Sequence, residues 1–234
     1  MLDAAFEALK TFDWGTDLAV VAPIEDAATA AHDKPELRRD LENRLIAALN
    51  GKLTRDAQDY ICRKLTTVGS AEAVPALSVL VVKPEHSHMA RFALERITAA
   101  EAGHALRGAL AYVTGITKIG VISSLGARRE TASVAPLGKL LADPDPAIAR
   151  AAALALGAIG NSESAAALQS ALQSSTGSLP QLVDALLSCA ESLLTSNKPA
   201  DANSIYKTLT SDNHPRLVRL AATRGLLACA SKQA

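Results

Sequence analysis

The sequence predicts an all-α fold, a right-handed α-α superhelix built of two-helix repeats stacked in series. Three observations predict it: a regular spacing of leucines, a composition that is 49% hydrophobic but only 3% aromatic, and glycine-containing turns between apolar stretches. A composition rich in alanine and leucine is typical of helices that approach one another closely. A two-helix unit cannot bury its apolar face alone, so such units must stack on their neighbours.

Leucines recur in two columns that keep the same spacing. The first column consists of Leu65, Leu94, Leu125, Leu156 and Leu187. Each of its first four members is followed, at a constant offset, by a member of the second column, Leu77, Leu106, Leu137 and Leu168. Because two columns in step rarely arise by chance, we attribute the period to the fold and expect these leucines to be buried between successive layers.

The clearest unit covers residues 143–172. Asp145 is placed to cap its first helix, and Pro146 suits the first helical turn, where the missing N–H is not needed. Gly160 is expected to end that helix, and Asn161 or Ser162 to start the second. The same arrangement recurs where residues 68–72 join helices expected at 60–67 and 73–82.

The pattern Asp-Pro-Asp-Pro-x-Ile-Ala-x-Ala-Ala-x-x-Ala-Leu-Gly-x-Ile-Gly in this unit resembles the short HEAT-like repeat named after phycobilisome lyases. Units at 54–83 and 114–142 resemble it less closely. The unit at 85–112 departs from it, with Thr98–Glu101 where the turn glycine is expected. Residues 54–172 also resemble the HEAT segment of large multidomain bacterial proteins with glucanase-like or cytochrome-type modules, through the stretches 61–65, 87–95 and 120–126. This likeness implies that the chain is a portion of a larger bacterial protein.

Three regions follow from the period. Residues 1–53 are expected to form an N-terminal helical cap, with helices at 2–12, 17–32 and 35–49 and a split or kink at Pro23. Residues 54–176 are expected to hold about four HEAT-like repeats. Residues 177–234 are expected to form less regular C-terminal helical repeats, because the spacing stretches after Gly177, with an amphipathic helix at 203–209 that contains Tyr206.

Charge and composition limit the function. Twenty-four basic and twenty-four acidic residues give no net charge, so no nucleic-acid partner is expected. No apolar run reaches the roughly 20 residues that span a bilayer, and the acidic N-terminus is unlike a signal peptide, so no membrane insertion is expected. We expect a soluble chain, cytoplasmic by default and exported if it is cut from a longer precursor. The cysteines Cys62, Cys189 and Cys229 are interpreted as small buried hydrophobes.

No catalytic residue, cofactor site or metal site is predicted, and the chain is not expected to be an enzyme. A metal site of His88 and His104 across two helices is the weaker alternative to polar helix-surface residues. The His-Glu dipeptides through which the HEAT-like deoxyhypusine hydroxylases bind iron are absent from the sequence, and the basic, aromatic groove of alkylpurine DNA glycosylases has no counterpart.

The favoured hypothesis is a non-catalytic protein–protein interaction scaffold or adaptor, in which the second helices of successive units line a concave groove for a protein or peptide. Arg107, Lys139 and Gln169 follow buried leucines and are the candidate binding residues, although a solvated helix face is the plainer interpretation of each. Two alternatives stay open: a structural spacer between catalytic or redox modules of a larger polypeptide, and a bilin-lyase-like enzyme suggested by the repeat resemblance.

Overall fold

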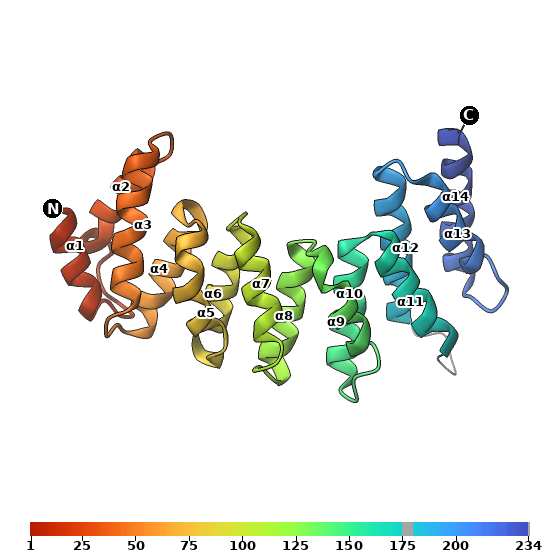
Figure 1. Cartoon of the computed structure of the whole chain (residues 1–234), viewed down its shortest axis with the longest axis horizontal. Coiled ribbons are helices and arrows are strands. Elements are labelled where there is room, and N and C mark those ends of the chain that lie inside the picture. The colour runs from red at the N-terminus through yellow and green to blue at the C-terminus, as the bar shows by residue number, and fades with distance from the viewer. Residues whose placement is uncertain (175–179, 234) are drawn as a thin grey trace. The chain divides into compact units, whose positions relative to one another are not determined.

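The structure is a computed structural model that describes residues 1–174 and 180–233. Within those ranges the chain is helical and contains no strand, which confirms the all-α class (Figure 1). The helices in chain order are α1 (Leu2–Ala8), η1 (Leu9–Thr11), η2 (Leu18–Val21), α2 (Ala22–Ala30), α3 (Pro35–Leu49), α4 (Arg55–Val68), η3 (Ala71–Ala73), α5 (Val74–Val81), α6 (Pro84–Arg96), α7 (Ala100–Ala109), α8 (Gly115–Ala127), η4 (Thr131–Ser133), α9 (Val134–Leu140), α10 (Pro146–Ile159), α11 (Ser162–Ser174), α12 (Pro180–Thr195), α13 (Pro199–Leu209) and α14 (Arg216–Gln233). They form two compact units, Met1–Ser124 and Leu125–Ala234.

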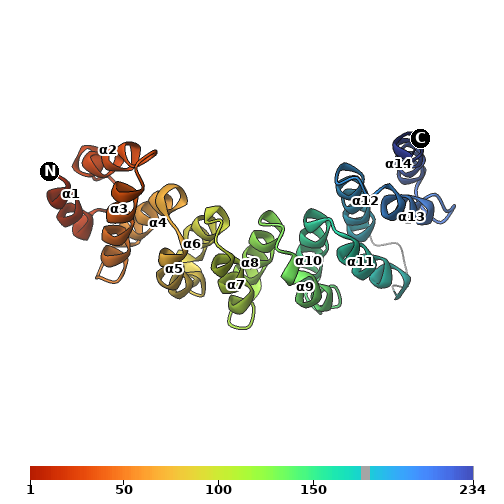
Figure 2. The same cartoon turned by 45° about the horizontal axis from the view of Figure 1, so that its top comes forward.

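Helices two apart in the chain pack against each other in both units. In the first unit the first helices α4 and α6 pack together, as do the second helices α5 and α7 (Figures 1 and 2). In the second unit the same holds for α10 with α12 and for α9 with α11. The two-helix repeat stacked in series is therefore confirmed.

The second leucine column is completely buried. Leu77, Leu106, Leu137 and Leu168 all have 0% exposure, and so do the first four members of the first column. Each fully buried leucine contributes roughly 1.5–3 kcal/mol relative to an exposed one. These eight leucines of the two columns therefore all lie in the core of the repeats.

The prediction for the fifth member of the first column is wrong. Leu186 is fully buried, whereas Leu187 is partly exposed. The reason is a change of register between α10 and α12. A Cβ placed on Gly126 would lie 2.8 Å from the Ala155 Cα, and a Cβ on Gly157 would lie 3.0 Å from the Ala185 Cα. The spacing in sequence from Gly157 to Ala185 is one residue shorter than the spacing from Gly126 to Ala155. The repeat that leads to α12 is therefore one residue shorter than the repeat before it. Leu186 therefore takes the buried position.

The caps of the clearest unit are confirmed. The Asp145 carboxylate accepts a hydrogen bond of 2.8 Å from the Ala147 N–H, and Pro146 lies in the first turn of α10. Gly160 ends α10 in the left-handed conformation, with φ of 63°. Asn161 starts α11, because its side-chain oxygen accepts a hydrogen bond of 2.7 Å from the Ser164 N–H.

The turn at 97–99 contains no glycine, and its backbone conformation does not require one. Ile97 ends α6 in an extended conformation, with φ of −67° and ψ of 115°. Gly69, at the corresponding place after α4, is also extended, with φ of −65° and ψ of 145°. A non-glycine residue adopts this conformation without strain, so the departure at Thr98–Glu101 leaves the helix pair intact.

The N-terminal helices follow the prediction with two splits. Helix α3 has the predicted bounds, with Leu41 and Leu45 buried and Leu37 46% exposed. The first predicted helix is divided into α1 and η1, and the second into η2 and α2, with Pro23 in the first turn of α2. The expected break at Pro23 is therefore confirmed.

Two further predictions concern the rest of the chain. The three cysteines are buried, as expected, and Tyr206 lies on α13 with 3% exposure. Gly177, and with it the expected boundary between residues 176 and 177, lies outside the described residues, so the three-region division stays a prediction. Across the described ranges, no helix joins the length and the apolarity that a bilayer crossing requires.

Candidate binding surface

The second unit contains an open groove of about 590 Å³. It is bounded by α9 and the two residues after it, by Ala149 of α10, by the second half of α11 and by the start of α12. Six of its lining residues are alanine or glycine: Ala135, Gly138, Ala142, Ala149, Ala167 and Ala171. The larger apolar residues on it are Val134, Leu141 and Leu182.

Small side chains on facing helices leave this space open. A Cβ placed on Gly138 would lie 3.6 Å from the Ala167 Cβ, an ordinary contact distance. Gly138 is therefore not required for a close approach of α9 to α11, in contrast to the tight contact at Gly157. Here the absence of side-chain volume widens the groove.

Four polar side chains also line the groove: Lys139, Ser170, Ser174 and Gln181. Lys139 lies exposed on α9 and is the one charged residue among the lining residues that the structure describes. The two serines lie one turn apart on α11 and the glutamine at the start of α12. The groove thus combines an apolar surface with one positive charge and several hydrogen-bonding groups.

The structure does not bring the three predicted binding residues together. Lys139 lines the groove, but Gln169 is partly buried on α11 and does not. Arg107 lies on α7 in the first unit, where its Nη2 is 3.5 Å from the His104 Nδ1. The described residues contain no cluster of three or more histidine, cysteine or carboxylate side chains that could hold a metal.

The period itself explains which residues were missed. Lys139 and Ser170 are separated by one full period of the leucine columns, and both line the groove. Arg107 and Gln169, by contrast, are equivalent to Gly138, which lies one period from each of them. The predicted set therefore mixed two columns of the repeat. Stepping by one period from Lys139 would have found Ser170, whereas Gln181 depends on the shifted register of α12.

Comparison with known proteins identifies the repeat. Residues 115–187, which include the groove, match the family model of HEAT repeats. The structure of the complex of CpcE and CpcF of phycocyanin lyase from Nostoc sp. PCC7120 is similar with 19% identity and a TM-score of 0.46, over 98% of this chain and 94% of that one. An archaeal HEAT-like repeats protein from Thermococcus onnurineus NA1 is similar with 14% identity and a TM-score of 0.44, over 100% and 93%. Human deoxyhypusine hydroxylase in complex with glycerol is similar with 14% identity and a TM-score of 0.37, over 98% and 96%. No curated protein matches the chain significantly.

Proposed function

We propose that this chain, which carries HEAT repeats at residues 115–187, is a non-catalytic interaction scaffold that holds a short segment of a partner protein in the groove of its second unit. The observation that carries the proposal is the open groove of about 590 Å³, in which alanine and glycine are six of the thirteen described lining residues. This volume lies within the roughly 300–1,000 Å³ of ordinary ligand sites. It is large enough for several side chains of a bound peptide.

The lining residues define the chemistry of the partner segment. Alanines and glycines present little volume of their own, so they suit large apolar side chains supplied by the partner, which are the usual anchors of protein interfaces. Lys139 favours an acidic residue beside those anchors, because it is the charged group of the lining. Ser170, Ser174 and Gln181 can donate hydrogen bonds to the carbonyl groups of a bound backbone.

The composition of the lining also supports a binding role over catalysis. Among the described residues that line the groove there is no carboxylate, histidine or cysteine. Ser170 and Ser174 therefore have no histidine or carboxylate partner in the groove to serve as the general base that an attacking hydroxyl needs. These features support a role in recognition of a partner.

Selection of peptides against the purified chain tests the proposal. A displayed library of random peptides should yield sequences that combine leucine- or phenylalanine-sized residues with aspartate or glutamate. Ser170→Trp fills the groove and should abolish binding of the selected peptides. Gln173→Trp is the matched control, because Gln173 is exposed on the same helix but does not line the groove.

Charge reversal gives a second arm. Lys139→Glu should weaken the acidic peptides about tenfold, whereas Arg150→Glu, exposed on α10 outside the lining, should leave them unchanged. Selected peptides that bind Ser170→Trp and Lys139→Glu as well as they bind the unmodified chain would refute the assignment of the groove.

A further inference from the structure

A second hollow, of about 360 Å³, lies in the first unit and has the opposite charge. It is lined by the loop at residues 12–16, by Leu18, by α4 and by Met89 of α6. Three carboxylates, Asp13, Asp56 and Asp59, line it against one guanidinium, Arg63. This hollow belongs to other helices than the groove of the second unit, and its lining favours a different class of ligand.

The tryptophan of this hollow is unusually exposed. Trp14 is the chain's single tryptophan, and it is 94% exposed. Tryptophan is highly buried on average, because its ring carries a large apolar surface. Tryptophan is enriched at protein interfaces, so an exposed indole at the edge of a hollow is suited to contact a partner.

Hydrogen bonds within the loop fix the place of Trp14. The backbone N–H of Trp14 donates to the Asp13 carboxylate at 2.9 Å, and the backbone N–H of Asp13 donates to the Thr16 hydroxyl at 3.0 Å. The Thr16 N–H donates to the Asp13 carbonyl at 2.9 Å. Gly15 supplies the left-handed conformation that the turn requires, with φ of 84°. These hydrogen bonds restrain the backbone of the loop, and a restrained backbone loses less entropy on binding.

Contacts with α4 hold the loop in position. Phe12 is 6% exposed, and its ring centroid lies 5.6 Å from that of Tyr60. The hydroxyl of Thr54, the cap of α4, donates to the Phe12 carbonyl and also accepts from the Ala57 N–H at 3.1 Å. The loop therefore lies directly against the first turns of α4, which carry Asp56 and Asp59.

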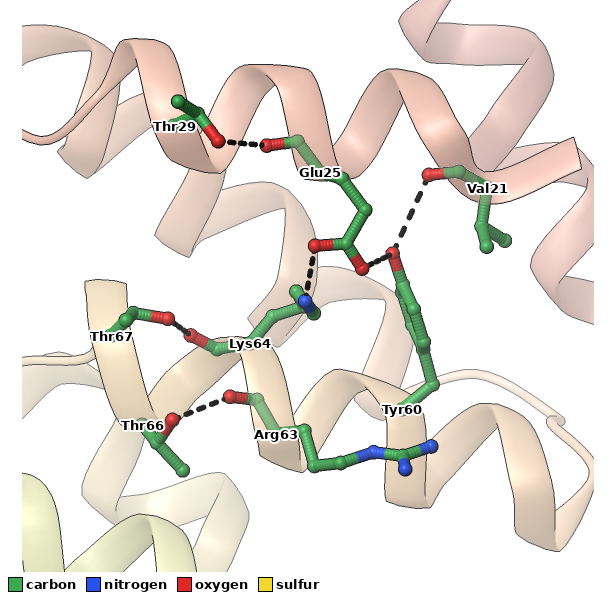
Figure 3. A network of polar contacts seen from close by, with 8 residues as sticks. All are labelled: Val21, Glu25, Thr29, Tyr60, Arg63, Lys64, Thr66 and Thr67. Carbon is green, nitrogen blue, oxygen red and sulfur yellow. Dashed lines mark hydrogen bonds and ion pairs between the residues drawn. The ribbon is translucent and has the colours of Figure 1, made fainter. Parts of the chain in front are cut away.

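A polar network ties η2 and α2 to α4. The Tyr60 hydroxyl donates to the Glu25 carboxylate at 2.9 Å and lies 3.4 Å from the Val21 carbonyl (Figure 3). Lys64 donates to the other oxygen of Glu25, and its ammonium lies 5.3 Å from the centre of the Tyr60 ring (Figure 3). The segments before and after Trp14 are thus both held against α4, and these contacts fix the walls of the hollow.

The carboxylates of the hollow are incompletely compensated. The Asp59 side chain is 24% exposed, and its nearest cation, the Arg55 Nε, is 4.0 Å away. Partial burial raises the pKa of Asp59 in spite of the attraction of Arg55. Asp56 lies one turn earlier on the same helix and adds a second negative charge. A cation placed in the hollow would be attracted by Asp13, Asp56 and Asp59 and repelled by Arg63 of the lining and by Arg55, so the three carboxylates outnumber the two guanidinium groups.

We propose that this hollow binds an arginine or lysine side chain of a partner protein, with its charge set among Asp13, Asp56 and Asp59 and its alkyl stem along Trp14. The flat apolar ring of Trp14 gives the alkyl stem a surface on which to pack. Leu18 and Met89 supply apolar contact for the stem and for the neighbouring partner residues. The first unit is then a recognition surface for a basic segment, whether or not the groove of the second unit binds an acidic one.

Fluorescence of Trp14 tests the proposal directly, because the chain has no other tryptophan. The probes are a short amidated peptide in which arginine alternates with serine and leucine, the same peptide with neutral citrulline at each arginine, and the same peptide with glutamate. The arginine peptide should change the Trp14 emission in a saturable way and bind about tenfold or more tightly than the citrulline peptide. The glutamate peptide should have no effect.

Variants assign the effect to the hollow. Asp56→Asn with Asp59→Asn should weaken the arginine peptide about tenfold, whereas Glu36→Gln with Glu101→Gln removes two exposed acids of the same unit outside the hollow and should not. Trp14→Ala should weaken a fluorescently labelled arginine peptide, measured by anisotropy. The thermal unfolding curve of each variant shows whether it folds.

Several results would overturn the proposal. These are equal binding of the citrulline and arginine peptides, full affinity in the folded Asp56→Asn, Asp59→Asn variant, and binding detected by anisotropy without any change of Trp14 emission. Absence of binding would overturn it as well. Equal affinity for methylguanidinium alone would assign the hollow to a free small cation and not to a protein segment.

Discussion

Replacing the two adjacent leucines of α12 one at a time tests the register that the structure assigns to this helix. Leu186→Ala removes a side chain with no exposure, and Leu187→Ala removes one that is partly exposed. Both variants change leucine to alanine in the same helix, so intrinsic helix propensity changes equally in the two. The difference between them reports burial alone.

The structure sets the size of the difference. Leu186→Ala deletes three buried carbons, worth about 0.8 kcal/mol each, or about 2.4 kcal/mol in transfer. The remaining cavity adds to this, so the free energy of unfolding should fall by about 3 kcal/mol. Leu187→Ala should lower it by about 1 kcal/mol, because part of that side chain already contacts water.

Urea unfolding followed by circular dichroism measures both values. The midpoint should shift to clearly lower urea for Leu186→Ala than for Leu187→Ala, with similar slopes for the two variants. An unbroken period in the first leucine column makes the opposite prediction, since it buries Leu187. Equal losses, or a larger loss for Leu187→Ala, would refute the one-residue change of register between α10 and α12.

Three further predictions concern single residues. Gly160→Ala should destabilise the protein by about 1–2 kcal/mol, because it places a side chain at a φ of 63° and within 2.5 Å of the Ser192 side chain. Gly108→Ala is the control, because its Cβ would meet nothing within 4 Å. In the same urea assay Gly108→Ala should be neutral or stabilising by up to about 1 kcal/mol. Burial alone would raise the pKa of Glu25, but the hydrogen bonds from Lys64 and Tyr60 lower it. The unmodified protein should therefore be more stable than Glu25→Gln above the unfolded-state pKa of Glu25, and this difference should shrink as the pH falls through the folded-state pKa. Equal acid unfolding of the two proteins would contradict this. Burial raises the pKa of the Cys62 and Cys189 thiols to about 12. Neither thiol should therefore react with a disulfide reagent at neutral pH until urea unfolds the chain, and rapid labelling of these two residues in the native protein would contradict their burial. Their contribution to stability should be lost as the pH rises from the ordinary thiol pKa towards about 12.

Local signals in the sequence were sufficient for most helix ends. Asp145, Pro146 and Gly160 act within a few residues of their own position, so their roles could be predicted from neighbouring residues alone. The second leucine column was equally accessible, since its regular spacing buries all four of its members. Helix α3 has its predicted bounds because Pro35 starts it and the leucines repeat every fourth residue.

Tertiary contacts decided what the sequence could not show. The register of α12 depends on the contact of Gly157 with Ala185, which no count of leucines reveals. The groove depends on which column of the repeat faces it, and Arg107, Lys139 and Gln169 were drawn from two different columns. The exposure of Trp14 depends on the contacts of Phe12 and Thr54 that fix the loop against α4. The sequence alone could not predict this exposure.

The contacts of Gly126 with Ala155 and of Gly157 with Ala185 allow the length of the repeat to vary. Where a glycine meets the alanine backbone of the next repeat, that meeting point fixes which face of the following helix turns inward, and the number of residues in between is free to differ. A repeat can therefore lose a residue and still stack. Insertions or deletions between these contacts should be tolerated, while exchanging Gly126 or Gly157 for a bulky residue should separate the layers whatever the length of the connection.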